Sequence, residues 1–537
     1  MDGRTDGLYF VYTAFDTMLP YVYVFVLSSV TVLAGLWFAY GYKSFGLPGR
    51  KSWNVPFFGG LFAIIQNWEV LLDFLLDLQE EFGYKTVGIP GPFFGSIAGG
   101  VIVIYSPENV DHVLNKNFGN YVKGQNVNDA LKDFLGDGIF ASDGKIWKKH
   151  RKVASRMFSR KLMRNGTAVA LSNAKKVVQH IEGISKRNES FDLADIFFRF
   201  TMDTFVEIAF GEKLGSLKKS HPFASAFDEV QYLCEKRFRN PLWKIQQWIP
   251  ANDQQTIRRN IATMNAFAKR VIKTTKDRHA ANDGSPKSMD LISRFLADSK
   301  QRKMPPPSVV ELRDIVMNFI FAGRDTTACA LSWQFFNICR DSDANGPILD
   351  NILKELLTAR ERVPELKSTY IYDLPYEIAF ELVTKHLPYL NAVTKETLRL
   401  HPSVPKNLKF AIDADLLPDG TKIPAGCAVL WSPYCMGRNP NIWGKRAKVY
   451  DPSRWFEDGD ISKPLKKDPS NSDYPAFHLM PRLCLGKPLA IMEIVLLTAS
   501  LVGSFNFKAT GPSKPEYKST LVLPMKNGMF VRATSRV

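Results

Sequence analysis

The sequence is poor in cysteine, with six such residues in a chain of 537. They stand at positions 234, 329, 339, 427, 435 and 484, and no two of them form a Cys-x-x-Cys pair. Disulfide scaffolds and structural zinc sites need closely grouped cysteines, so both are excluded. We therefore expect a reducing compartment, in which most of these cysteines are small buried hydrophobic residues.

The chain also lacks a concentrated basic arm, internal repeats and extended low-complexity tracts. Its 70 Lys and Arg residues exceed its 53 Asp and Glu residues and give a net charge of +17, but they are spread along the whole length. This distribution disfavours nucleic-acid binding, whereas an anionic membrane or an acidic redox partner fits the excess of positive charge. With 45% hydrophobic and 23% charged residues, the composition is typical of a folded globular protein.

Charge is missing from Thr17 to Tyr42, and the apolar run from Tyr21 to Tyr42 would span, as a helix, a bilayer core of about 30 Å. A cleaved signal peptide is the alternative, but it would be shorter and would follow basic residues, whereas the preceding tail is net acidic. The basic residues Lys43, Arg50 and Lys51 follow the run, which places the rest of the chain in the cytosol.

We predict a tail and single transmembrane anchor over residues 1–45 and one domain over residues 46–537. Helical periodicity dominates this domain, in Trp68 to Phe82, Leu162 to Lys186, Leu193 to Phe210, Ile257 to His279 and Ser308 to Arg340. Short strands are predicted at Val101 to Tyr105, Phe410 to Ile412 and Ala428 to Trp431. The predicted fold class is therefore mainly α with small β-sheets.

The best-defined helix begins at Ser308, where Glu311 three residues later completes a capping box. It contains the sequence AGRDTT, residues 322–327, inside an apolar stretch. A carboxylate and two hydroxyls in such a helix cost burial free energy, so their presence indicates a chemical role. The alternative is that Arg324 and Asp325 simply face solvent.

Each residue of this segment has a possible role. Gly323 would let a ligand approach the backbone. Asp325 and Thr326 would supply an acid and an alcohol for proton delivery. A Thr hydroxyl that bonds to the preceding turn would also open the helix there.

A second chemical segment, PAFHLMPRLCLGKPLA, occupies residues 475–490 and precedes a long apolar helical pattern. Cys484 thus lies just before a helix N-terminus, whose dipole favours a thiolate. Arg482 would pair with an anionic cofactor edge. A lone cysteine before a helix is usually structural, so this interpretation depends on the other motifs.

The chain resembles the cytochrome P-450 superfamily in five separated motifs that occur in the family's order. They are a W-x-x-x-R motif with Trp147 and Arg151, the oxygen-activating segment AGRDTT, an E-x-x-R motif with Glu396 and Arg399, the segment DPSRW with Arg454, and the cysteine loop FHLMPRLCLG with Cys484. The resemblance extends from roughly residue 45 to the C-terminal end.

This resemblance implies a b-type haem with Cys484 as the axial thiolate ligand of iron. It assigns the propionates to Trp147, Arg151 and Arg482, and a buried ion-pair network that braces the cysteine loop to Glu396, Arg399 and Arg454. The implied catalytic residues are Asp325 and Thr326. Further cofactor contacts would come from Ala322, Gly323, Lys409, Phe477 and Gly486.

The chain departs from the family's pattern at three of these positions. Met480 replaces a glycine of the cysteine loop, and a positive φ there would cost on the order of 1 kcal/mol or more. Ser453 replaces the glutamate of the segment around Arg454, which matters little if Arg454 carries the network. Ala322 stands where some fatty-acid hydroxylases have a glutamate that esterifies the haem, so we expect no covalent haem link.

The resemblance further implies a monooxygenase that inserts one oxygen atom from O2 into an apolar substrate, with electrons from NADPH-cytochrome P-450 reductase. The basic residues Lys148, Lys149, Arg151 and Lys152 share a predicted helix that suits docking of an acidic reductase, although a solvated helix face is the alternative. With the predicted anchor, we expect a single-pass protein of the endoplasmic reticulum membrane whose catalytic domain faces the cytosol.

Four stretches are most similar to the plant, fungal and oomycete branch that hydroxylates medium- and long-chain fatty acids at the chain end: LGDGIFASDGKIWKKHRK, ETLRLHPSVP, LPDGTKIPAG and YCMGRNPNIWG. By this resemblance, the pocket would be lined by residues 119–140, 197–248, 319–326, 403–408 and 520–523. Phe and Leu are frequent in these ranges, which suits an apolar ligand.

Hydroxylation of a terpenoid, sterol or alkane is the alternative within the enzyme class. Outside it stand a haem protein without turnover and a membrane-tethered binding protein without haem, and an isomerase that needs no reductase is a further possibility. Asp325 and Thr326 argue against the first and the last, because both residues fit proton delivery to oxygen.

Overall fold

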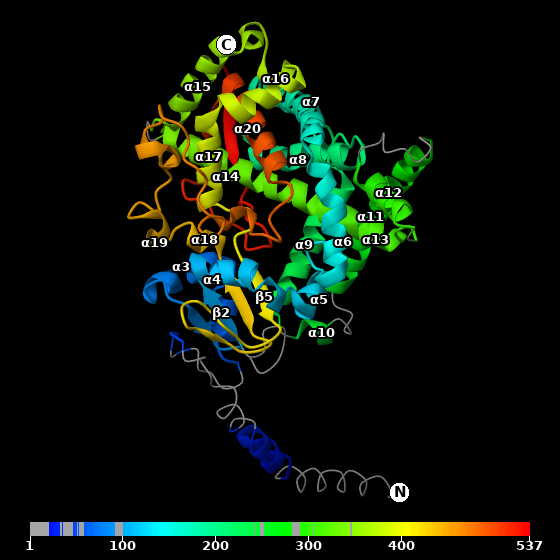
Figure 1. Cartoon of the computed structure of the whole chain (residues 1–537), viewed down its shortest axis with the longest axis vertical. Helices are drawn as coiled ribbons and strands as arrows, with labels where there is room; N and C mark the ends of the chain where they lie inside the picture. The colour runs from blue at the N-terminus through cyan, green and yellow to red at the C-terminus, as the bar shows by residue number, and fades with distance from the viewer. Residues whose placement is uncertain are drawn as a thin grey trace, which may run out of the picture.

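The computed structural model describes residues 21–32, 35, 47–50, 52, 58–91, 100–240, 242–246, 252–281, 290–303, 305–343 and 346–536. Helices form most of the domain, and the largest sheet, with β2 and β5, lies in its lower part in Figure 1. The predicted combination of many helices with small sheets is confirmed.

All five helices predicted from periodicity are present, and α8 has the predicted ends. The sequence does not predict α9, because buried charged residues such as Glu235 and Arg237 interrupt its apolar pattern. The α-helices are α2 (Leu61–Gln66), α3 (Leu71–Glu81), α4 (Pro107–Asp111), α5 (Gly124–Leu135), α6 (Gly144–Ser155), α7 (Arg160–Ser185), α8 (Leu193–Phe210), α9 (Pro222–Arg239), α10 (Trp243–Gln246), α11 (Asn252–Ala281), α12 (Leu291–Gln301), α13 (Val309–Ile320), α14 (Thr326–Asp343), α15 (Ile348–Arg362), α16 (Tyr376–Glu381), α17 (Pro388–Leu400), α18 (Pro433–Met436), α19 (Pro440–Trp443) and α20 (Lys487–Ser504).

The sheets join segments that are far apart in the sequence. The largest has the strand order β1-β2-β8-β5-β3, and β2 pairs with β8 in parallel, with Val101 opposite Ala428. The smaller sheets have the orders β4-β10-β9 and β6-β7. The strands are β1 (Val87–Ile89), β2 (Val101–Ile104), β3 (Tyr121–Val122), β4 (Phe191–Asp192), β5 (Asn407–Ala411), β6 (Asp415–Leu416), β7 (Lys422–Ile423), β8 (Ala428–Trp431), β9 (Phe505–Ala509) and β10 (Phe530–Ser535).

The helices α14 and α20 form the centre of the core. Most of their residues are buried, and α20 is apolar on nearly every side, as expected for a core helix. Among the described helices, α20 alone is long and apolar enough to cross a membrane, but most of it is buried in this core. The predicted anchor is described as a shorter apolar helix, Tyr21–Val32, and most of its remaining residues lie outside the described ranges.

The long helix predicted from Ser308 to Arg340 contains a π-helical turn. It begins as predicted, because the Ser308 hydroxyl accepts the N–H of Glu311 at 3.0 Å. After α13, the chain forms the π-helical turn η7 (Phe321–Asp325) and then continues as α14. The Thr326 hydroxyl donates to the Ala322 carbonyl at 2.6 Å, as the sequence predicts for a helix opened by a hydroxyl.

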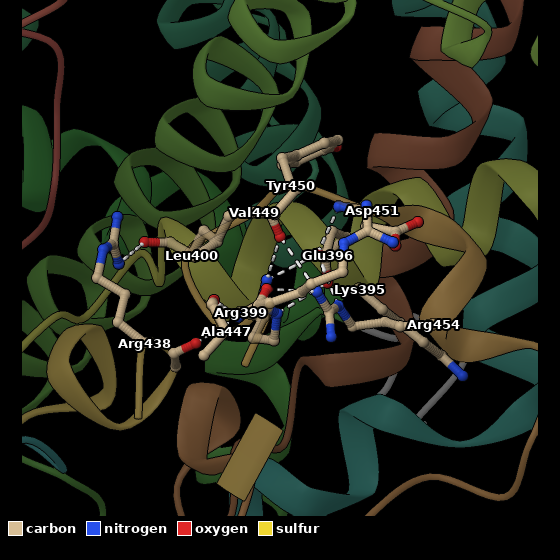
Figure 2. Close-up of polar contacts among 12 residues, drawn as sticks. Lys395, Glu396, Arg399, Leu400, Arg438, Ala447, Val449, Tyr450, Asp451 and Arg454 are labelled. Carbon is tan, nitrogen blue, oxygen red and sulfur yellow. Dashed lines mark hydrogen bonds and ion pairs between the residues drawn. The ribbon is translucent and has the colours of Figure 1, made fainter. Parts of the chain in front are cut away.

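A fully buried ion pair joins Glu396 and Arg399 on α17. Arg399 Nε donates to Glu396 Oε2 at 2.8 Å, and Arg399 Nη2 donates to Glu396 Oε1 at 2.7 Å. The guanidinium also donates to the carbonyl oxygens of Ala447 and Val449, which Figure 2 shows, and to that of Gly437. This one side chain therefore ties α17 to a segment that lies about forty to fifty residues later.

Glu396 accepts further hydrogen bonds from the same segment. Its Oε1 atom accepts from Arg454 Nε at 2.9 Å and from the Asp451 N–H at 2.7 Å. Its Oε2 atom accepts from the Trp455 indole at 3.1 Å. The structure thus brings Glu396, Arg399 and Arg454 together, but their hydrogen bonds hold residues 437–455 and not the cysteine loop itself. The loop is reached indirectly, through the ring of Tyr474, whose centroid lies 5.3 Å from that of Trp455.

We predict that Glu396→Gln lowers the free energy of unfolding by at least about 3 kcal/mol, because the substitution leaves the buried Arg399 guanidinium without an opposite charge. Urea unfolding followed by tryptophan fluorescence measures this change. The control is Glu381→Gln, which removes an exposed ion pair with Lys385 and leaves the unfolding midpoint unchanged. Equal midpoints for both variants would show that the fold does not depend on the buried pair.

Candidate functional site

A cavity of about 430 Å³ lies inside the domain, within the size range of about 300–1,000 Å³ that is common for small-molecule sites. Each of the five ranges expected to line a pocket contributes to its wall. Apolar residues from η3 (Trp68–Val70), α3, β1 and β2 line it as well, and the sequence does not predict these contributions. They arise because the largest sheet folds the N-terminal segment against the C-terminal half of the chain.

Cys484 lines this cavity just before α20. The other five cysteines are buried, whereas Cys484 has exposed surface at the cavity wall. Burial raises the pKa of Cys484, and hydrogen bonds from the N–H groups of Gly486 and Lys487, together with the charge of Arg151, counteract this rise. These donors and charges are the surroundings that stabilise a cysteine thiolate.

The backbone strain in the cysteine loop falls on His478 and not on Met480. His478 has φ 64° and ψ −174°, a conformation that residues other than glycine rarely adopt. The chain reverses at this point because it leaves the short turn η13 (Pro475–Phe477). The His478 ring compensates by packing edge-on against Trp431, and its Nδ1 atom accepts the Leu479 N–H at 2.8 Å. Met480 does not have a positive φ, so the cost that would have followed from one does not arise.

Basic side chains gather where the cysteine loop meets α6, and we call Lys123, Arg151, Lys409 and Arg482 the cation cluster. Burial, with repulsion from Arg482 and Lys123, lowers the pKa of Lys409 to about 6. Burial and repulsion from Arg482 lower the pKa of Lys123 to about 8. Asp143 accepts from Arg482 Nη2 at 2.6 Å, but the same carboxylate also accepts the N–H groups of Lys123 and Gly124. The positive charge of the cluster is therefore only partly compensated.

The predicted W-x-x-x-R residues lie inside this cluster. The Arg482 and Arg151 guanidinium carbons lie 4.5 Å and 5.9 Å from the centroid of the Trp147 ring. Arg151 Nη2 donates to the carbonyl of Leu483 at 2.8 Å, so α6 is joined directly to the cysteine loop. Arg482 Nε is buried without a hydrogen-bond partner. A donor remains available for an anionic group.

The structure adds one residue to this cluster that the sequence does not indicate. Lys123 lines the cavity, but it is one of 70 basic residues in the chain and no motif distinguishes it. Lys409, which the resemblance assigns to the cofactor, donates to the Tyr121 carbonyl at 3.0 Å and does not line the cavity. Phe477 and Gly486 do line the cavity, as expected for cofactor contacts.

The AGRDTT segment divides into residues that face the cavity and residues that face away from it. Ala322, Gly323 and Thr326 line the cavity wall, whereas Arg324 and Asp325 do not. The latter two are 4% and 2% exposed, so the alternative that they face solvent is excluded. Arg324 Nη1 donates to Asp325 Oδ1 at 2.8 Å, and burial nevertheless raises the pKa of Asp325.

Gly323 borders the cavity, and the structure gives a second reason for a glycine at this position. A Cβ atom at this position would collide with the ring of Phe205 on α8. Glycine is therefore required here for the close packing of α8 against the π-helical turn, although the residue also borders the cavity.

Comparison with known proteins agrees with these motifs. The family model of cytochrome P450 matches residues 48–532. Cytochrome P450 704C1 of Pinus taeda is 32% identical, and the match covers 95% of this chain and 97% of the relative. Cytochrome P450 704B1 of Arabidopsis thaliana is also 32% identical, over 91% of this chain and 95% of the relative. Cytochrome P450 94A1 of Vicia sativa is 30% identical, over 90% of each.

The residues around the cavity fit the cofactor of this family. A thiol lies at the wall beside a helix N-terminus, and a cation cluster with an unpartnered guanidinium N–H suits the two propionates of a haem. The chain belongs to the cytochrome P450 family, as a monooxygenase that uses haem iron with an axial cysteine thiolate.

Proposed function

We propose that this cytochrome P450 hydroxylates medium- or long-chain fatty acids at the terminal carbon, with electrons from NADPH-cytochrome P450 reductase. The observation that carries the proposal is the cavity wall, which is mainly apolar and includes Phe319 and Leu521 on different segments of the chain. Internal C–H bonds are weaker than terminal ones, so terminal attack requires a wall that admits only the chain end to the reacting position. Phe319 and Leu521 are our candidates for that constriction.

In this proposal, Cys484 provides the thiolate, and Trp147, Arg151 and Arg482 hold the propionates together with Lys123. The bound haem would supply oxygen activation and the transfer of one oxygen atom to the substrate. The partly compensated charge of the cation cluster would then be paired with two carboxylates, which removes the repulsion among its members.

We assign proton delivery to Thr326 at the cavity wall. Its hydroxyl donates a hydrogen bond to the Ala322 carbonyl, and the same hydroxyl oxygen can accept a hydrogen bond from a donor in the cavity. Asp325 would serve as the acid behind it, since burial raises its pKa above the ordinary range of a carboxyl group. The pair with Arg324 keeps this acid out of the apolar cavity.

Residues 1–45 would anchor residues 46–537 to the endoplasmic reticulum membrane, with the catalytic domain in the cytosol. The helix Tyr21–Val32 has exposed apolar side chains and stands apart from the domain, on the side of the largest sheet (Figure 1). Leu242 and Ile245, beside and on α10, are also exposed and suit contact with a bilayer surface.

The reductase would dock on α6. Lys148 and Lys152 are exposed on this helix, whose Arg151 contacts the cysteine loop. Lys149 is less available, because its Nζ lies 2.6 Å from Glu311 Oε1. A docking site here would bring electrons to the thiolate side of the cofactor.

Cys484→Ser is expected to abolish the red-shifted absorption band of the reduced, CO-treated protein, because a thiolate opposite CO produces that band. The control Cys427→Ser removes a buried thiol outside the cavity and should retain the band. Loss of the band in Cys427→Ser with retention in Cys484→Ser would overturn the ligand assignment.

Thr326→Ala is expected to retain haem and substrate binding while product formed per NADPH falls several-fold, with hydrogen peroxide as the balance. Parallel assays of NADPH, peroxide and product measure the coupling. Thr394→Ala is the matched control, because Thr394 makes the same type of hydrogen bond to a preceding carbonyl, at 3.0 Å, away from the cavity. Unchanged coupling in Thr326→Ala would remove this residue from proton delivery.

With reductase and NADPH, the protein is expected to convert medium- or long-chain fatty acids to terminal hydroxy acids, detected by mass spectrometry. Phe319→Ala and Leu521→Ala should move oxidation inward along the chain, because each substitution widens the wall. Leu523→Ala, a buried neighbour outside the wall, should leave the product positions unchanged. Turnover of a sterol, a terpenoid or an alkane without any fatty acid would contradict the proposed substrate.

A further inference from the structure

Besides the cation cluster, a second group of polar side chains interrupts the apolar wall of the cavity. Trp68 on η3, Glu235 on α9 and Lys406 just before β5 all line the cavity, and we call them the polar cluster. The charges that act on Glu235 are those of Lys406, Arg239 and Glu69, whereas Cys484 is surrounded by Arg151 and Lys487. The polar cluster is therefore a part of the wall separate from the cysteine loop.

The hydrogen-bonding capacity of this cluster is largely unused. Glu235 is 1% exposed, and neither of its carboxyl oxygens has a partner at ordinary hydrogen-bond geometry, although the Trp68 side chain lies close enough to lower the pKa of Glu235 partly against the effect of burial. The indole N–H of Trp68, which is 6% exposed, also has none. Lys406 Nζ lies 3.9 Å from Glu235 Oε1, beyond hydrogen-bond distance, and donates to the Thr520 carbonyl at 3.0 Å. Two of its three N–H groups thus remain for another acceptor.

Residues next to the cluster reach the surface of the domain. Arg239, one turn after Glu235 on α9, donates to Glu69 Oε1 at 3.1 Å, and the Glu69 side chain is 60% exposed. Glu69 directly follows Trp68 in the sequence. A ligand group that reaches the polar cluster would therefore lie close to the protein surface, with the rest of the ligand in the apolar interior.

We propose that the polar cluster binds the carboxyl group of the substrate, so that the methyl end of the fatty-acid chain points toward Thr326. Lys406 and Trp68 would donate hydrogen bonds to the substrate carboxylate, and the O–H group of neutral Glu235 would donate a third. The inference rests on the proposed fatty-acid function and adds a recognition site to it.

The charges and hydrogen-bond donors of the polar cluster favour a carboxylate over other polar ligand groups. Burial raises the pKa of Glu235, which favours the neutral form of that side chain. Burial also lowers the pKa of Lys406, and a nearby anion would raise that pKa again. A neutral Glu235, a charged Lys406 and a carboxylate sum to zero charge. A hydroxyl group would satisfy fewer of these donors, and an alkane or a sterol skeleton would satisfy none.

A fixed carboxyl end also orients the substrate. With the carboxyl group held at the polar cluster, the methyl end extends along the apolar wall toward Thr326, where the proposed constriction admits only the chain end. Loss of the carboxyl-binding site should therefore change both the affinity for the fatty acid and the position at which it is oxidised.

The test is a spectral titration of the haem-loaded full-length protein with lauric acid and with its methyl ester, followed by product analysis. Lys406→Met should weaken the binding of lauric acid by about tenfold or more and broaden the positions of hydroxylation, because a charged hydrogen bond is lost. Binding of the methyl ester should change little. Lys518→Met is the matched control, since Lys518 is exposed, packs over Tyr232 and does not line the cavity.

Two further variants separate recognition from folding. Glu235→Gln should keep the affinity for lauric acid, because an amide N–H replaces the acid proton, whereas Glu235→Ala should weaken it. Each variant is compared at equal haem content, from the CO band of the reduced protein. Equal loss of acid and ester affinity in Lys406→Met, or no loss of either, would overturn the carboxyl site while fatty-acid hydroxylation stands. Failure of the unaltered protein to bind any fatty acid would overturn both proposals.

Discussion

The buried ion pair of Glu396 and Arg399 is the interaction on which the rest of the structure depends. Neither side chain contacts water, so each charge needs the other and the carbonyl and N–H groups that surround the pair. These partners lie in residues 437–455, which are thereby fixed against α17. Because α17 also packs against α14 and α20, the helix that carries Thr326 and the helix that follows Cys484 share one support.

The cavity enclosed by these helices is mainly apolar, but it carries polar groups at two separate places. The cation cluster holds more positive charge than Asp143 compensates, and the polar cluster holds a carboxyl group, an ammonium group and an indole N–H with unused hydrogen-bonding capacity. Buried groups of this kind are costly unless a ligand pairs with them. Both places suit anionic ligand groups, which we propose to be the propionates of the cofactor at one and the carboxyl group of the substrate at the other.

At the π-helical turn between α13 and α14, the AGRDTT segment has some residues that face the cavity and others that are buried behind it. Thr326 and Ala322 face the cavity, while Arg324 and Asp325 form a buried ion pair behind it, which Asp228 joins from α9. Since α9 also carries Glu235, the same helix contacts the polar cluster and the acid behind Thr326. The two sites that we propose for substrate recognition and proton delivery therefore share one supporting helix.

The sequence by itself determined the helices with regular apolar spacing, such as α8, and the motif residues Trp147, Thr326, Glu396 and Cys484. Local rules suffice for these features, because periodicity, capping and motif spacing are read over a few neighbouring positions. Only the tertiary structure decided that Lys123 joins the cation cluster, that Gly323 accommodates Phe205, and that Glu235 and Lys406, 171 positions apart, line one cavity. A lone charged residue has the same local signature whether it is solvated or buried, and its role is set by segments that the fold brings to it.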